Sequence, residues 1–192
     1  GYETFGGEIT TFSPSYKKEE MQELVKISNH IIFNSFVQWQ TFKPMIDEAN
    51  KMRESKIEVG LRVNPLYSEV TPEIYNPCIE GSRLGIPPKE FKKGVKKYGL
   101  EGISGLHFHT HCEQNSDALK RTLKHFIKHF GDYIPQMQWI NFGGGHHITR
   151  KDYDRELLVK IIKNFKDKFH TEVYLEPGEA VGWQCGFLIG SV

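Results

Sequence analysis

A run of three glycines followed by two histidines stands out in the sequence, in the stretch WINFGGGHH from Trp139 to His147. The apolar residues before it predict a strand, and the glycines fall where that strand would end. Because glycine has no Cβ, the backbone at Gly143, Gly144 and Gly145 can come close to a bulky anion and point successive N–H groups at it. We therefore expect these glycines to bind a phosphate group. The alternative is a plain glycine turn between two elements.

Two further histidines alternate in His109-Thr110-His111, so on a strand both imidazoles would face the same side. Such a pair binds metal in barrel hydrolases, and His146 could complete the set. The sequence offers no well-placed aspartate to finish a metal site. The other interpretation therefore stays open, in which one histidine packs in the core and the other lies at its rim.

Glu176 follows another apolar run and precedes Pro177-Gly178, so a stiff turn would hold it at the end of a strand. A carboxylate in that position can accept a hydrogen bond from a protonated ring nitrogen, although it could also simply pair with Arg62. A phosphate-binding loop, a histidine able to stack on a flat ring and a carboxylate for a ring nitrogen together describe a site for pyridoxal 5'-phosphate (PLP).

Six short apolar runs would position these residues, each ending in polar, glycine or proline residues and followed by a helical pattern. The runs begin at residues 9, 30, 57, 103, 139 and 173. Ser35, Ser116 and Thr149 are expected to cap the helices that follow three of them, and Pro87-Pro88 to begin another. Residues 66–86 form a long irregular excursion, and excursions of that length in compact domains are usually functional.

Alternating strands and helices predict a parallel sheet of the α/β class. Six units are too few to close an eight-stranded barrel, so the choice lies between an open doubly wound sheet and part of a (β/α)8 TIM barrel. The polar candidates all fall at the carboxyl ends of predicted strands, where barrel enzymes gather their active sites. We therefore predict, for residues 1–182, about six of the eight units of a barrel.

Composition excludes several classes of protein. The chain has 192 residues, 38% of them hydrophobic, and a formal net charge of +1, which gives no electrostatic reason to bind nucleic acid or an anionic membrane. Three widely spaced cysteines, Cys78, Cys112 and Cys185, favour a reducing compartment over a disulfide framework. No leader-like or membrane-length apolar run is present, so we expect a cytoplasmic protein.

Five segments, taken in order, resemble one known family. They are RVNP (62–65), SRLGI (82–86), FHTHCEQ (108–114), NFGGGHH (141–147) and LEPGEAVG (175–182). The chain resembles the barrel-type (fold-type III, alanine racemase-like) PLP decarboxylases of ornithine, diaminopimelate and carboxynorspermidine, with HTHCEQ and GGGHH typical of the last group. The resemblance implies PLP-dependent decarboxylation of carboxynorspermidine or carboxyspermidine to norspermidine or spermidine, by a homodimer.

The resemblance also implies roles for individual residues. His109 would stack on the cofactor ring as a catalytic residue, Gly143, Gly144 and Gly145 would bind the phosphate, and Glu176 would hold the ring nitrogen. Arg62 would support the ring, and Cys112 occupies a position where ornithine-type relatives have a phosphate-binding serine. Glu113, His146 and Glu179 are expected to bind the amine end of the substrate, because carboxylates suit an ammonium-bearing chain.

Two departures from the family pattern limit these expectations. Glu179 stands where ornithine-type relatives have an arginine that meets the phosphate. The lysine that binds PLP covalently has no counterpart, since nothing before Ile9 can be its strand. We therefore expect a piece of a longer protein, inactive alone, in which residues 183–192 begin the crossover to a C-terminal β-domain. The alternatives are a metal-dependent barrel hydrolase using His109, His111 and His146, and an inactive decarboxylase-like regulatory protein.

Overall fold

A single sheet of six parallel strands organises the chain, in a computed structural model that describes residues 2–187 and 189–190. The strands are β1 (Thr10–Phe12), β2 (His30–Phe33), β3 (Glu58–Arg62), β4 (Gly105–His107), β5 (Trp139–Asn141) and β6 (Glu172–Tyr174), and their order in the sheet is their order in the sequence. A doubly wound sheet reverses its strand order at a switch point, whereas a barrel does not. The fold is therefore a partial (β/α)8 barrel, as the sequence predicted.

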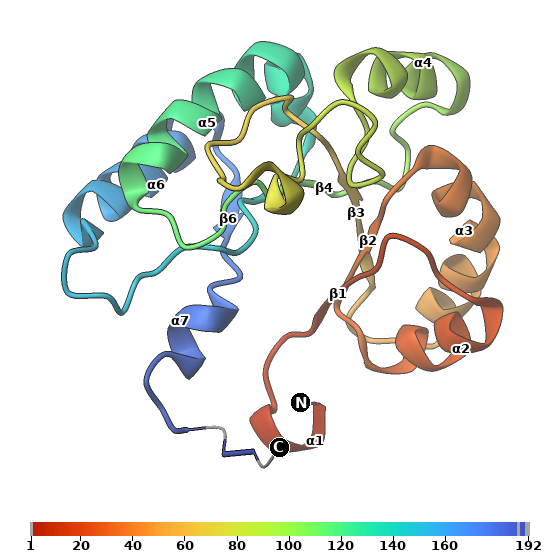
Figure 1. Ribbon diagram of the computed structural model, residues 1–192. Helices are drawn as coiled ribbons and strands as arrows, with labels where there is room; N and C mark the ends of the chain where they lie inside the picture. Colours follow the sequence, from red (N-terminus) through yellow and green to blue (C-terminus); the bar gives the residue numbers. More distant parts are fainter. Residues whose placement is uncertain (1, 188, 191–192) are drawn as a thin grey trace.

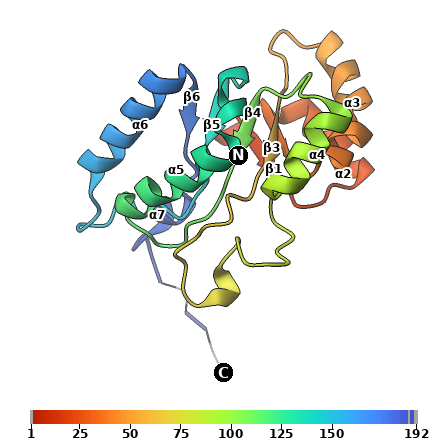
Figure 2. The same ribbon diagram turned by 90° about the horizontal axis from the view of Figure 1, so that it is seen from above.

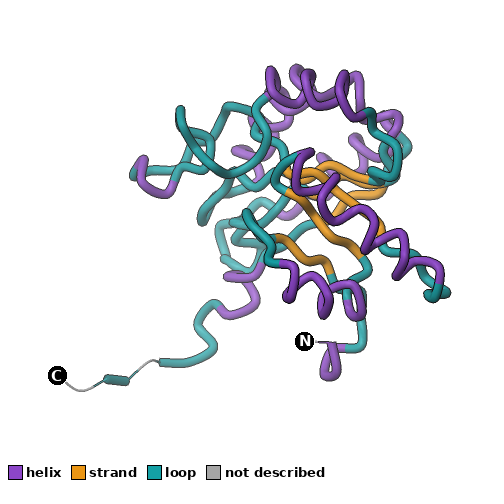
Figure 3. The backbone as a smooth tube through the Cα atoms, turned by 90° about the vertical axis from the view of Figure 1, so that its right-hand side faces the viewer, coloured by secondary structure: helices purple, strands orange, loops and turns teal. Residues whose placement is uncertain are grey.

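Helices cover the outer face of this curled sheet (Figure 1). The helices of the described residues are α1 (Tyr2–Phe5), α2 (Lys18–Ile27), α3 (Phe36–Lys51), α4 (Pro88–Tyr98), α5 (Ser116–Phe130), α6 (Arg155–Phe169) and α7 (Gly178–Gly182), with 3-10 turns at Glu73–Tyr75 and Gly131–Gln136. The covering layer consists of α2 to α6, whereas α1 and α7 lie apart from it, at the bottom of Figure 1. Seen from above, α2 to α6 follow the strands around an arc (Figure 2). The strands lie inside this arc of helices (Figure 3).

The hydrophobic core fills the layer between the strands and the helices. Strand residues Ile31, Leu61, Leu106 and Ile140 are fully buried, and large aromatic side chains meet them from the helices, chiefly Trp39, Phe91, Phe126 and Phe165. Burying one such side chain stabilises the folded state by roughly 1.5–3 kcal/mol relative to leaving it exposed. This packed layer therefore holds the strands in position. The strand ends in turn set the positions of the polar residues.

Helix caps show where the sequence prediction was accurate and where it was wrong. Ser35 caps α3, because its hydroxyl accepts a hydrogen bond from the Gln38 amide at 3.1 Å. Ser116 does not cap α5: Asn115 does, and Ser116 is the first helical residue. Thr149 does not cap α6 either. Asp154 takes that role, and the Thr149 hydroxyl donates instead to the Ala180 carbonyl at 2.8 Å, which ties the loop after β5 to α7.

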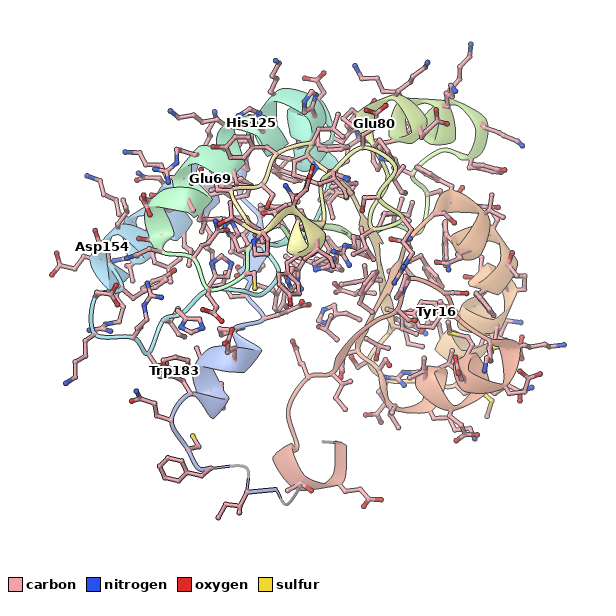
Figure 4. All side chains as sticks on the ribbon, in the orientation of Figure 1. Tyr16, Glu69, Glu80, His125, Asp154 and Trp183 are labelled. Atoms are coloured by element: carbon pink, nitrogen blue, oxygen red, sulfur yellow. The ribbon has the colours of Figure 1, made fainter. Side chains whose placement is uncertain are left out.

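The excursion between β3 and α4 is ordered and pinned at both ends. Its base closes where Val63 and Ile86 form a parallel bridge. Farther out, the Glu69 carboxylate accepts two hydrogen bonds from the Arg121 guanidinium on α5, and the Tyr67 ring stacks on His125 at 4.0 Å between centroids. Figure 4 shows Glu69 and His125 on these two neighbouring segments. The excursion therefore forms a fixed wall beside the strand ends.

Within the described residues no helix combines the length and apolar character needed to cross a bilayer. After α7, residues 183–187 and 189–190 form turns and irregular chain. Residues 188, 191 and 192 of the predicted crossover lie outside the described residues.

Candidate active site

A row of polar side chains crosses the carboxyl ends of three neighbouring strands. Arg62 on β3 is paired in register with His107 on β4, and His107 with Asn141 on β5. All three are at least 94% buried. Their shared register places the three side chains at the same level of the barrel, and Glu176 follows two residues after the end of β6. Of the residues predicted to gather at this end of the sheet, this row includes Arg62 and Glu176, whereas His107 and Asn141 were not predicted.

Glu176 is held in place from both sides. Its backbone N–H donates to the Gly143 carbonyl at 2.9 Å, and its Oε1 accepts a hydrogen bond from the Asn141 amide at 2.8 Å. Oε2 lies 3.5 Å from the His107 Nε2. Burial alone would raise the pKa of Glu176, but the interactions with His107 and Asn141 outweigh it and hold the pKa at about 2. The carboxylate is ionised and oriented at neutral pH. Its partners are these two residues, whereas the alternative expected an ion pair with Arg62.

His109 lies next to Glu176 and the glycine loop. Its Nδ1 accepts a hydrogen bond from the Gly144 N–H at 3.3 Å, which leaves Nε2 to carry the proton. Burial, together with neighbouring His107 and Arg62, lowers the pKa of His109 to about 4. The ring is therefore neutral, and a neutral aromatic ring fixed by one hydrogen bond is suited to stack against another flat ring.

Each of the three glycines is required by close packing within the chain. A Cβ on Gly143 would lie 2.4 Å from the Phe108 carbonyl oxygen, and one on Gly145 would lie 2.2 Å from that of His111. A Cβ on Gly144 would lie 2.6 Å from the Glu176 carbonyl oxygen. The sequence prediction attributed the glycines to an anion; their first role is to let the loop settle between the ends of β4 and β6.

Two of the three backbone amides in the glycine loop already donate hydrogen bonds within the chain. The Gly143 N–H donates to the Asn141 side chain at 2.8 Å, and the Gly144 N–H to His109. Gly143 and Gly145 both have positive φ, so the loop turns sharply at each of them. A phosphate would meet this turn through the remaining amide of Gly145, or by taking over the hydrogen bond that Gly144 now gives to His109.

Arg62 lies beneath the site, inside the sheet. Its guanidinium carbon is 4.6 Å from the centre of the Phe12 ring, and Nη2 donates to the His109 carbonyl at 3.3 Å. Burial lowers the pKa of Arg62 to about 10, so it stays charged at neutral pH. Arg62 thus supports the backbone that carries His109, and its predicted support of the cofactor ring stays a prediction.

The predicted substrate residues separate into two places. Glu113 and Glu179 carry exposed carboxylates, and His147 lies with them. His146 is instead 99% buried, with its ring 5.0 Å from that of His111. Burial and His111 lower the pKa of His146 to about 3, so it is a neutral core residue. Cys112 is exposed, and slight burial together with the carboxylates of Glu113 and Glu179 raises the pKa of its thiol.

The set of three histidines proposed for a hydrolase is not brought together. Among the described residues, two groups have three possible ligand atoms within 4.8 Å of one another: His107, His109 and Glu176, and Glu113, His147 and Glu179. Neither includes His111 or His146. We call the first the inner group and the second the outer group.

Sequence reasoning missed His107 and Asn141. Both lie on the interior face of the barrel and hold Glu176, but each occurs within an apolar run where a buried polar residue is indistinguishable from a satisfied core residue. The alternation of His107, His109 and His111 was the available signal, since it extends the two-residue period of the strand by one more histidine.

Comparison with known proteins agrees with this geometry. The chain is 49% identical over 185 residues to a carboxynorspermidine/carboxyspermidine decarboxylase from Campylobacter jejuni, which covers 96% of this chain and 45% of that protein. It is 36% identical over 191 residues to a carboxyaminopropylagmatine decarboxylase from Synechocystis, and this match covers 99% of this chain and 47% of that protein. Over this length the chain is similar to carboxynorspermidine decarboxylases.

A solved structure of a similar protein superimposes on the chain. Carboxynorspermidine decarboxylase from Campylobacter jejuni, in complex with norspermidine, gives a TM-score of 0.79 at 45% identity and covers 95% of this chain and 44% of its own. No protein-family model matches the chain. The chain spans about half the length of the curated relatives it matches. The fold-type III decarboxylases are PLP-dependent enzymes. In this chain Glu176, His109 and the glycine loop, the residues expected to meet the ring nitrogen, the ring face and the phosphate, contact one another.

Proposed function

We propose that this chain forms the cofactor-binding part of a PLP-dependent decarboxylase that converts carboxynorspermidine or carboxyspermidine to norspermidine or spermidine. The observation that carries the proposal is the convergence of Glu176, His109 and the glycine loop, which touch one another at the barrel rim. The names of the relatives support the substrate class, and the norspermidine complex of a similar enzyme supports a polyamine product.

PLP, when bound, supplies a protonated ring that accepts the electron pair released as CO₂ leaves the substrate. The chain's part is to keep that ring protonated and in place. Glu176 would accept a hydrogen bond from the ring nitrogen, since its pKa of about 2 keeps it ionised throughout the physiological range. Asn141 and His107 hold the carboxylate while it does so.

The remaining cofactor contacts follow from position. His109, which is neutral, would stack on the ring face. The Gly145 amide, and the Gly144 amide if it leaves His109, would bind the phosphate, while Gly143, whose amide donates to Asn141, shapes the turn of the loop. Arg62 supports the His109 backbone from inside the barrel. Cys112 lies close to the loop, since a Cβ on Gly145 would be 2.8 Å from the Cys112 nitrogen, and its contact to the phosphate stays a prediction.

A complete enzyme needs more than these residues provide. In our proposal, residues 1–182 form part of the barrel, the chain after residue 182 leads to a C-terminal β-domain, and a lysine on a further strand binds PLP covalently. The active protein is a cytoplasmic homodimer. Reading the gene upstream of Gly1 tests this directly: an in-frame strand ending in lysine supports the enzyme, and a start codon near Gly1 contradicts it.

The activity is tested on the full-length protein reconstituted with PLP. Incubation with carboxynorspermidine, carboxyspermidine and carboxyaminopropylagmatine, with CO₂ and polyamine quantified, should give one CO₂ per polyamine formed with at least one of the first two. A protein that binds PLP but releases no CO₂ supports the regulatory alternative. Hydrolytic activity that is lost on chelation and restored by zinc supports the hydrolase alternative.

A further inference from the structure

The outer group brings together three side chains from separate βα connections. Glu113 lies in the loop after β4, His147 in the loop after β5, and Glu179 in α7. Their possible ligand atoms all lie within 4.8 Å of one another, and the His147 Nε2 is 3.0 Å from the Glu179 Oε2. This convergence is not a by-product of one helix or turn, because each residue is supplied by a different βα connection.

The burial of these residues is uneven. The His147 side chain is 1% exposed, whereas the Glu179 side chain is 44% exposed and Glu113 is exposed. Neither nitrogen of His147 has a hydrogen bond of good geometry within the described residues, although Nε2 approaches the Glu179 carboxylate. A buried polar ring without a satisfied partner is costly, so His147 is aimed at a position that another polar group should complete.

The outer group contains no lysine or arginine. Two carboxylates meet there, and within the described residues neither forms an ion pair with a lysine or arginine. Like charges at this separation repel each other. The group is therefore arranged to receive a cation.

Trp183 indicates which kind of cation. Its ring lies 5.0 Å from the His147 ring, tilted by 68°, and is 40% exposed. Figure 4 shows Trp183 just beyond α7. An indole face attracts an alkylammonium and packs against its methylene groups, whereas it offers no ligand to a metal ion.

We propose that Glu113, Glu179 and Trp183 form a binding site for a terminal ammonium group of a polyamine, with His147 as the positioning residue that orients the Glu179 carboxylate. The site rests on the proposed function for the identity of the amine. It differs from the sequence prediction in two residues: His147 replaces His146, which is turned into the core, and Trp183 is added.

The test measures norspermidine binding, without turnover, to the PLP-loaded full-length protein by isothermal titration calorimetry. Glu113→Gln, Glu179→Gln and Trp183→Leu should each weaken binding by about tenfold or more, since each removes a direct contact. The matched control is Glu156→Gln, an exposed glutamate on α6, which should leave the affinity unchanged. PLP absorbance should be the same in all four variants.

His147 is tested by two substitutions. His147→Gln keeps a side-chain N–H that can hold Glu179 and should stay within about threefold of the wild-type affinity, whereas His147→Ala should lose about tenfold. Since His147 is buried, the three contact variants keep the proposal testable if His147→Ala fails to fold. A structural role alone would not give this rescue by glutamine.

The outcomes separate the two proposals. Wild-type protein that binds PLP and norspermidine, with equal affinity in all three contact variants, overturns the ammonium site while the decarboxylase proposal stands. Wild-type protein that takes up no PLP, or binds PLP but releases no CO₂, overturns the proposed function. Stoichiometric Zn²⁺ binding that is lost in Glu179→Gln, or loss of norspermidine binding on chelation, identifies the outer group as a metal site and overturns the ammonium assignment.

Discussion

The inner and outer groups are built from the same residue types but differ in how their carboxylates are held. Glu176 in the inner group accepts a hydrogen bond from an amide and faces an imidazole inside the barrel. Glu179 in the outer group faces one buried imidazole and is otherwise open, with Glu113 beside it. The inner group is therefore a fixed hydrogen-bond acceptor for a protonated ring nitrogen. The outer group is an open site suited to a cation.

The strongest test of this difference exchanges each carboxylate for an amide in the full-length protein. Glu176→Gln should lower kcat by about 10²-fold or more with little change in KM, because a neutral amide cannot keep the cofactor ring protonated. Glu179→Gln should raise KM with a smaller effect on kcat, because it removes binding to the substrate chain. Steady-state CO₂ release measures both. Equal changes in kcat for the two variants would remove the distinction between the groups.

Packing around the two groups can be compared by adding one methyl group to each. Gly144→Ala places a Cβ 2.6 Å from the Glu176 carbonyl oxygen and 3.1 Å from the His109 ring, and should lower the free energy of unfolding by about 1–3 kcal/mol. The control is Gly178→Ala, beside Glu179, where an added Cβ meets nothing within 4 Å. It should leave stability unchanged. Urea unfolding of the two variants distinguishes a packed inner group from an open outer one.

The pH dependence of stability should report the burial of the inner imidazole. His109 has a pKa of about 4 in the folded protein, below its ordinary value of 6.5. Well above pH 6.5 the imidazole is neutral in both the folded and the unfolded chain. As the pH falls from 6.5 toward 4, His109 becomes protonated in the unfolded chain but stays neutral in the folded one, so the free energy of unfolding decreases. Without PLP, His109→Gln should reduce this loss by about 1–2 kcal/mol near pH 4.5. An unchanged pH profile would mean that the imidazole is solvated.

Glu176 should affect the stability of the folded protein over a lower range of pH than His109 does. Its pKa is about 2 in the folded protein against 4.5 ordinarily, so its contribution to stability is complete above pH 4.5 and is lost as the pH falls toward 2. Glu176→Gln should therefore flatten only that lower part of the profile. A flattening above pH 5 in this variant would contradict the assignment.

The sequence predicted the barrel because the relevant signals are local. Apolar runs and helical periods repeat in order, and the parallel sheet follows from their alternation. The caps at Ser116 and Thr149 were wrong because Asn115 and Asp154 are equally good caps, and the choice depends on tertiary contacts such as that of Thr149 with Ala180.

The site was predicted less completely, for a different reason. Glu176, His109 and the glycines follow strand ends, so their convergence could be inferred from the fold. The sequence could not show which ring of the adjacent pair His146-His147 faces the site, because the direction of each ring depends on its neighbours. His146 packs against His111, whereas His147 contacts Glu179 and Trp183. The partners of Glu176 on the barrel interior, His107 and Asn141, depend on strand register, which the sequence does not give.

A crystal structure of the full-length protein with PLP bound tests the central claim most directly. The account predicts the ring nitrogen within hydrogen-bond distance of the Glu176 carboxylate, the His109 ring against the face of the cofactor, and the phosphate on the backbone of Gly143 to Gly145. A cofactor whose ring nitrogen faces a neutral group, or whose phosphate lies away from the glycine loop, would contradict it.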